Sequence, residues 1–258
     1  MVADDEPAIA VFDAESRPLA GELIALDESP LPLDHAERKA AKPDLESLCL
    51  LPDGVLFTLG SGATERRERG WLFSPGDHAR AEVSLANLYA TLRAELADLN
   101  VEGAAVARDR LWLAQRGNGR DGKNAVVELD LPAALTDLRE RRTIDPAAVR
   151  SIRRYELGEV EGVTLSFSDL CPLPDGRLLF CAVAEAGEST YLDGECVGAA
   201  LGVLDPGGVQ ALDHLEEPHK IEGVSISSGG RDGVELLLVA DGDDPAAAAP
   251  LLKTSLTL

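Results

Sequence analysis

Three glutamates hold the same place in a phrase that returns along the chain. Glu46, Glu102 and Glu222 each open an apolar run, followed first by Ser or Gly and then by an apolar residue. If these runs are the inner strands of one closed array, the three carboxylates converge at one end of its axis. Converging carboxylates repel one another, so such a site binds a cation, holds protons at raised pKa values or recruits basic partners.

The residue types around these glutamates indicate which cation is expected. Carboxylate oxygens with no nearby His or Cys favour Ca²⁺ or Mg²⁺ over zinc, and we take Ca²⁺ as the expected ion. In the fourth copy of the phrase, aligning LCPLPDG with LCLLPDG without gaps puts Ser168 opposite Glu46 and Asp169 one step later. The predicted metal ligands are therefore Glu46, Glu102, Glu222 and Asp169.

Three basic residues stand close to the acidic positions. Lys42 and Lys220 precede their glutamates by four and two residues, and Arg116 ends the second apolar run of its unit. In one interpretation they neutralise the charge of a bound substrate. In the other they pair with the glutamates in an internal ionic lattice that joins neighbouring units. No GxSxG elbow or histidine-based triad occurs, so the catalytic residues stay unassigned.

Copies of one hairpin phrase predict the elements that position these residues. They begin near Asp44, Asn100, Phe167 and Lys220, at a period of roughly 40 to 65 residues, which is typical of a β-propeller or a similar array. Hairpin turns are predicted at PDG from Pro52, PDG from Pro174 and RDG from Arg231. We predict one all-β domain over residues 1–258, a five-bladed propeller, with six blades as the alternative.

The first blade is expected to be incomplete. VADDEPAIAVFDA near Met1 resembles VADGDDPAAAAPLL near Val239, so residues 1–30 would form the second half of a blade. Its inner strand would then lie before Met1, and strands from both ends of the chain would close the ring. A first blade that is naturally short is the alternative interpretation.

Two segments break the strand pattern. SLANLYATLRAELADL from Ser84 has leucines at a helical spacing, and LPAALTDLRERRTIDPAAVR from Leu131 resembles short helical turns. Both are expected to be insertions between blades that cover the packing beneath them.

A further set of polar residues stands where second strands are expected to end. Whether this set shares a face with the glutamates depends on strand length and stays open. Its members are Asp4, Asp5, Gly60, Ser61, Arg116, Asn118, Glu185, Asp241, Asp243 and Asp244.

Composition limits the classes of partner. The formal net charge of −22 repels polyanions, so neither nucleic acid nor an anionic membrane is an expected partner. The four cysteines form no CxxC pair, and Cys49 and Cys171, at matching positions, are expected in the core. No apolar run is long enough to span a membrane, and the first residues lack a secretory pattern. A cytoplasmic location is the default expectation, with a signal upstream of Met1 left open.

The phrases DLESL, NVEGA and KIEGV, with LGSG, QRGNG and VADGDD closing the second strands, resemble an uncharacterised family of bacterial β-propellers. More distantly the chain is similar to phytase-like and SdiA-regulated propellers and to calcium-activated nucleotidases. This resemblance implies a five-bladed ring and an axial Ca²⁺.

Two functions follow as expectations. The first is Ca²⁺-dependent hydrolysis of phosphate or other esters; the second is a non-catalytic scaffold that binds a small molecule or a protein at the ring face. A glycoside hydrolase is a weaker third interpretation, because only 4% of the residues are aromatic.

Overall fold

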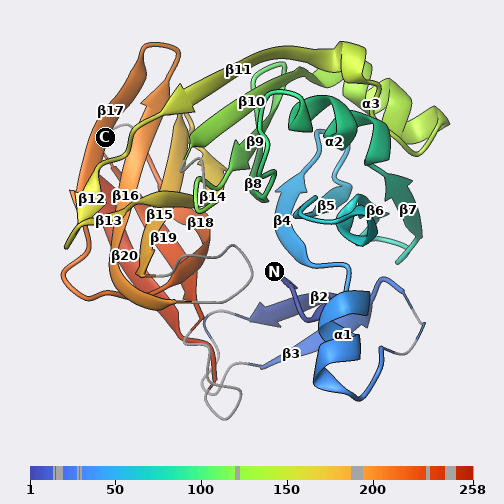
Figure 1. The fold of residues 1–258 in the computed structure, drawn as a ribbon, viewed down its shortest axis with the longest axis horizontal. Coiled ribbons are helices and arrows are strands. Elements are labelled where there is room, and N and C mark those ends of the chain that lie inside the picture. The colour runs from blue at the N-terminus through green and yellow to red at the C-terminus, as the bar shows by residue number, and fades with distance from the viewer. Residues whose placement is uncertain are drawn as a thin grey trace.

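The computed structural model describes residues 1–13, 15, 20–27, 29, 31–119, 123–186, 194–230, 233–241 and 248–257. In this part of the chain, antiparallel sheets succeed one another around a common centre, with short helices between them (Figure 1). The prediction of an all-β, propeller-like arrangement is confirmed.

Three sheets have four strands each, and in each the strands follow one another in chain order from the centre outward. The first contains β4 (Leu45–Leu50), β5 (Leu56–Gly60), β6 (Arg69–Phe73) and β7 (Arg80–Ser84). The second contains β8 (Val101–Ala107), β9 (Arg110–Gln115), β10 (Asn124–Asp130) and β11 (Val149–Tyr155). The third contains β14 (Ser166–Pro172), β15 (Leu178–Ala186), β16 (Glu195–Asp205) and β17 (Gly208–His214).

The remaining sheets are smaller. A C-terminal sheet contains β18 (Ile221–Gly229), β19 (Gly233–Ala240) and β20 (Leu251–Thr257). An N-terminal sheet contains β1 (Val2–Ala3), β2 (Glu6–Asp13) and β3 (Ala20–Ala25). A two-stranded sheet joins β12 (Glu159–Val160) to β13 (Val163–Thr164).

The expected number of five or six complete blades is not confirmed. Four sheets have a full inner strand, and these strands contact one another in the order β4, β8, β14, β18. In the N-terminal sheet the strand that contacts β4 is β1, which is only two residues long. The described chain therefore has four blade-like sheets, with the smaller N-terminal sheet beside them.

Both PDG segments form the predicted hairpin turns. Gly54 and Gly176 adopt φ angles of 82° and 85°, which favour glycine, and their amides donate to the carbonyls of Leu51 and Leu173, each at 2.9 Å. The first two residues of the predicted RDG turn, from Arg231, lie outside the described residues.

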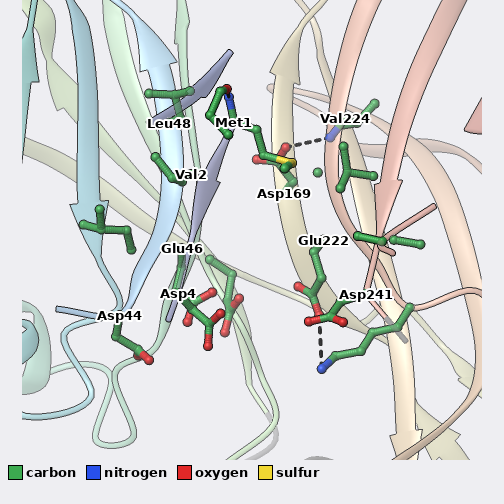
Figure 2. Close-up of a pocket in the computed structure, with 18 of the residues that line it drawn as sticks. Met1, Val2, Asp4, Asp44, Glu46, Leu48, Asp169, Glu222, Val224 and Asp241 are labelled. Atoms are coloured by element: carbon green, nitrogen blue, oxygen red, sulfur yellow. Dashed lines mark hydrogen bonds and ion pairs between the residues drawn. The ribbon is translucent and has the colours of Figure 1, made fainter. Parts of the chain in front are cut away.

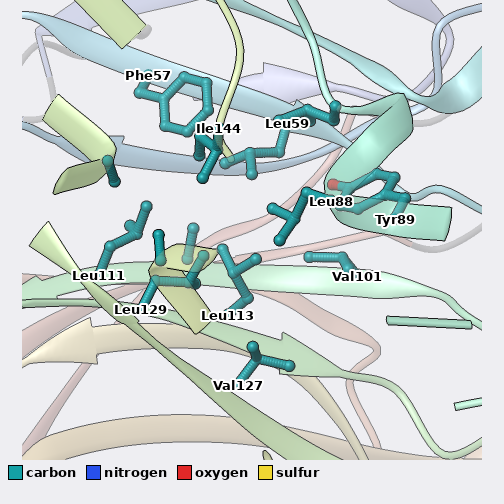
Figure 3. Packing of buried hydrophobic residues seen from close by; sticks show 14 of the residues in the cluster. Phe57, Leu59, Leu88, Tyr89, Val101, Leu111, Leu113, Val127, Leu129 and Ile144 are labelled. Atoms are coloured by element: carbon teal, nitrogen blue, oxygen red, sulfur yellow. The ribbon is translucent and has the colours of Figure 1, made fainter. Parts of the chain in front are cut away.

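The helical insertions cover the core as expected. Helix α2 (Ala86–Arg93) places Leu88 and Tyr89 over the side chains of β5 and β9, including Phe57 and Leu113 (Figure 3). The hydroxyl of Tyr89 donates to the carbonyl of Gly60 at 2.8 Å, so burying the ring leaves no polar atom unsatisfied.

Helix α3 and one further helix complete the fold. Helix α3 (Leu131–Glu140) begins at Asp130, whose side chain accepts a hydrogen bond from the amide of Ala133 at 3.0 Å. Helix α1 (His35–Ala41) was not predicted, and it leads directly into Lys42. Short 3-10 turns lie at Glu65–Arg67 and Pro146–Ala148.

The cysteines are all free. Cys49 and Cys171 lie in the hydrophobic core, which confirms the expectation from their matching positions. Among the described helices, none combines the length and the hydropathy that crossing a membrane requires.

Candidate functional site

A β-bulge recurs near the start of all four inner strands. In β4, Leu45 pairs with Gly60 and Ser47 pairs with Leu59, the adjacent residue of β5. Glu46 is therefore an extra residue without a pairing partner of its own on β5. The same step leaves Glu102 extra in β8, Ser168 in β14 and Glu222 in β18. The bulges match the ungapped alignment of the repeats, including Ser168 opposite Glu46. A bulge re-aims a side chain relative to the pleat, and here it does so at one end of every inner strand.

The second-strand residues share this end of the sheets. In an antiparallel hairpin the start of the first strand pairs with the end of the second: Val101 faces Gln115, and Ile221 faces Ala240. The residues at the ends of the second strands therefore lie at the same end of the sheets as the glutamates. Asp243 and Asp244 lie outside the described residues.

All seven predicted site residues line one cavity of about 650 Å³ at the centre of the sheets. They are Glu46, Glu102, Asp169, Glu222, Lys42, Arg116 and Lys220. The second-strand and loop residues Asp4, Asp44, Asn100, Asn118, Glu185 and Asp241 line it too. Figure 2 shows Glu46 and Asp4 opposite Glu222 and Asp241 across this space.

Lys42 is buried beneath the N-terminal residues. Its ammonium pairs with Asp4, with Asp5 at 2.9 Å and with Asp44 at 3.5 Å. Burial disfavours the charged amine, yet these carboxylates raise the pKa of Lys42 above its ordinary value. Lys42 is therefore a cation that ties β1 and its following turn to β4.

Asp44 joins several side chains at this end. It accepts from the hydroxyl of Ser61 at 2.6 Å and pairs with the guanidinium of Arg67 at 2.6 Å. Its backbone has a φ of 56°, a conformation that Asp tolerates better than most residues. The sequence pattern did not single out Asp44, because both partners come from a later loop.

A second ionic chain crosses from β9 to β18. Arg116 pairs with Glu102 at 3.4 Å and with Glu185 at 2.7 Å, and Lys220 reaches Glu185 and Glu222, each at 3.5 Å. Charges from three sheets thus neutralise one another inside the cavity. These are the contacts expected of the ionic-lattice interpretation.

Glu102 is fixed further by a neighbour on its own strand start. The side-chain amide of Asn100 donates to Glu102 at 2.6 Å, and the backbone amide of Asn100 donates to the side chain of Gln115 at 2.8 Å. The next residue, Gly103, permits β8 to approach β14 closely, since a Cβ there would lie 2.7 Å from the amide nitrogen of Leu170.

Asp169 is held by backbone rather than by a cation. Its two oxygens accept from the amides of Leu170 at 2.7 Å and Val224 at 2.8 Å. Burial raises the pKa of Asp169 to about 8, although both hydrogen bonds oppose the shift. Burial and the two amide donors therefore act on this carboxyl in opposite directions, and burial is the larger effect.

The three bulge glutamates also have raised pKa values. For Glu222, burial raises the pKa to about 8 against the opposing effect of Arg116. Burial, and then the charges of Glu102 and Asp44, hold the pKa of Glu46 well above its usual range. Burial raises the pKa of Glu102 as well, against Arg116. Each group would be stabilised in its charged form by an added cation.

Glu46 differs from the other two glutamates in its contacts. Within the described part of the chain, no basic side chain or hydrogen-bond donor contacts its carboxylate. One oxygen each from Glu46, Asp4 and Asp44 lies within 4.8 Å of the others, a spacing that suits oxygen ligation of a metal ion.

The fold and this site define a propeller-like all-β protein with a cavity lined by carboxyl groups at its centre. More particularly, the chain belongs to the family of unknown function DUF6910, whose model matches residues 38–245. No curated protein matches the sequence.

Among solved structures, the chain is similar to a gluconolactonase from Xanthomonas campestris, with 15% identity and a TM-score of 0.40 over 77% of this chain. It is also similar to luciferin-regenerating enzyme, with 13% identity and a TM-score of 0.48 over 97% of this chain. The matches span 59% and 71% of those proteins. The expected likeness to phytase-like propellers and nucleotidases stays a prediction.

Proposed function

We propose that the central cavity binds a divalent cation, with Ca²⁺ expected, together with a small molecule, and that hydrolysis of a phosphate or other ester is the associated reaction. One observation carries the proposal. Glu46 stands at a bulge among other carboxylates, faces a cavity of about 650 Å³ and has no basic partner among the described residues. A bound cation would neutralise the excess of carboxylates at this end.

Hard oxygen ligands are available for such an ion. Glu46, Glu102, Glu222 and Asp169 are the proposed ligands, and all four line the cavity. Among the described residues, the acidic group with ligand spacing is Glu46 with Asp4 and Asp44, so the other three proposed ligands would reach the ion through water. When bound, the ion would polarise an ester oxygen or acidify a water molecule.

Lys42, Arg116 and Lys220 are the proposed substrate-binding cations, and all three line the cavity. Lys220 pairs with Glu185 and Glu222 at 3.5 Å each, Arg116 pairs with Glu185 at 2.7 Å, and Lys42 pairs with Asp4, Asp5 and Asp44. The same cations also hold the acidic residues in place.

A non-catalytic scaffold is the second candidate. Each of the three predicted substrate-binding cations already bridges carboxylates, as an ionic lattice requires. In that case the cavity binds a small molecule or a protein segment without turnover.

We also infer that the N-terminal sheet occupies the place of a fifth blade, since β1 contacts β4 as the neighbouring inner strands do. A cytoplasmic location is proposed as well, because four free cysteines are typical of reducing compartments. The net charge of −22 favours neither nucleic acid nor membrane as partner.

Thermal unfolding in EDTA and in CaCl₂ tests the cation. Ca²⁺ at about 100 times its dissociation constant should stabilise the fold by about 2.7 kcal/mol, raising Tm by roughly 5 to 10 °C. Glu46→Gln and Glu102→Gln should remove the increase, while Glu235→Gln, on an exposed position of β19, should retain it.

NaCl at matched ionic strength is the control for screening. An unchanged Tm in excess Ca²⁺ and Mg²⁺ would contradict the metal site. Turnover is then measured with 4-nitrophenyl phosphate and 4-nitrophenyl acetate, with and without Ca²⁺. A Ca²⁺-dependent melt without turnover of any ester would favour the scaffold.

A further inference from the structure

The central cavity has two ends of different chemistry. Glu46, Asp4 and Glu222 line one end, while Leu48 and Val2 lie across from Val224 further along the cavity (Figure 2). Leu48 and Val224 each follow a bulge glutamate by two residues. The polarity of the cavity thus changes along its own axis.

The polar groups that Figure 2 labels at the apolar end are held by backbone. The amino group of Met1 donates to the carbonyl of Ala10 at 3.1 Å. Asp169 is the acidic residue that Figure 2 shows beside Val224, and each of its oxygens already accepts a backbone amide. Aliphatic side chains of β19 and β20 also line the cavity, among them Leu237, Val239 and Leu251.

The apolar end also reaches the surface. Val11 and Phe12 of β2 line the cavity and are nevertheless 46% and 41% exposed. An apolar group can therefore enter beside β2 and extend inward past Val2 toward Glu46. Exposed neighbouring apolar side chains on one strand mark a surface that gains from being covered.

We propose that the cavity takes an amphipathic small molecule, an ester whose alkyl or aryl group lies against Val2, Leu48 and Val224 and whose polar group faces Glu46. This inference rests on the proposed function for the ionised end and assigns the substrate class. A uniformly polar ligand, such as a sugar phosphate, would leave hydroxyl groups against aliphatic side chains without hydrogen-bond partners. A volume of about 650 Å³ suits a ligand of this kind.

Binding of the neutral dye 1-N-phenylnaphthylamine tests the apolar end without needing turnover. Its fluorescence should rise to saturation at one site per chain, both in EDTA and in CaCl₂. Leu48→Ser and the nearly isosteric Val224→Thr should each weaken binding at least fivefold. Leu23→Ser, on an exposed residue of β3 outside the cavity, should leave it unchanged.

Displacement of the dye by methyl esters tests the substrate class. From methyl butyrate to methyl octanoate, displacement should improve about fourfold for every added methylene. Absence of saturable dye binding, equal affinity in all four proteins, or displacement by glucose 6-phosphate in preference to methyl octanoate would overturn the inference. Val224→Thr keeps the test valid if Leu48→Ser fails to fold.

The two proposals fail separately. Loss of the Ca²⁺-dependent melt alone removes the cation and leaves the apolar end intact. Loss of dye binding with an intact Ca²⁺ effect removes the amphipathic substrate alone.

Discussion

Glu46→Gln should make the metal-free protein more stable at pH 8. One oxygen of Glu46 lies within 4.8 Å of oxygens of Asp4 and Asp44. Two unit charges at that distance repel by about 3.5 kcal/mol at an effective dielectric constant of 20, and by about 1 kcal/mol in water. Lys42 and Arg67 offset part of this repulsion, so we expect a gain of roughly 1 to 3 kcal/mol in the free energy of unfolding.

The pH dependence follows from the raised pKa of Glu46 in the folded chain. Below the ordinary glutamate pKa of 4.5, Glu46 is protonated in both the folded and the unfolded chain and does not lower the free energy of unfolding. As the pH rises from there toward the raised pKa, the unfolded chain releases the proton first, so the wild type loses up to about 1.4 kcal/mol per pH unit. The glutamine variant lacks this loss, and the two stability curves should meet near pH 4.5.

Urea unfolding in EDTA between pH 5 and pH 8, followed by far-ultraviolet circular dichroism, measures the difference. The m-values should agree, which would show that the same surface is exposed on unfolding. Glu235→Gln is the matched control and should follow the wild type at every pH. A Glu46→Gln variant less stable than wild type at pH 8 would mean that Glu46 is held by a favourable contact, and the reasoning would be refuted.

Two further predictions concern buried groups away from Glu46. Arg116→Ala should lower the free energy of unfolding by about 3 to 5 kcal/mol, because Glu102 and Glu185 lose a buried partner. Arg139→Ala, which breaks an exposed pair with Asp53, should lower it far less. Equal losses in urea unfolding would contradict the buried pairing. In native protein, Cys196 should react first with Ellman's reagent, because its thiol is only half-buried. Burial raises the pKa of Cys49 to about 12, so the reactive thiolate is scarce at that position. Rapid modification of all four thiols before unfolding would contradict this packing.

The repeat pattern predicted the strands and the relation of the acidic positions to one another. Apolar alternation and the PDG turns were sufficient to place the inner strands, and the ungapped alignment put Ser168 at the position that the pairing register shows. Convergence of Glu46, Glu102 and Glu222 in one cavity follows from arranging equivalent strands around a centre. Whether these residues bind a metal stays a prediction.

Long-range pairing accounts for what the sequence did not indicate. Asp44 gains its role from Arg67 and Ser61, which reach it only after β5 has folded back on β4. Glu185 joins two cations from different sheets, and no local pattern signals that. The fifth blade stays a proposal, because similarity between segments does not reveal that β1, the strand beside β4, has only two residues.

The repeated bulge separates the packing of the inner strand from the choice of the residue that faces the axis. In a regular strand each side chain is committed to one face by its neighbours, so changing an inward residue alters how the whole strand packs. Here the acidic residue is the extra residue of a bulge and lies outside the pairing register. The residues after it keep their pairing partners whichever residue occupies the bulge. Ser168 already illustrates such an exchange, because β14 carries a hydroxyl at its bulge while the residues directly after it pair as in the other three inner strands.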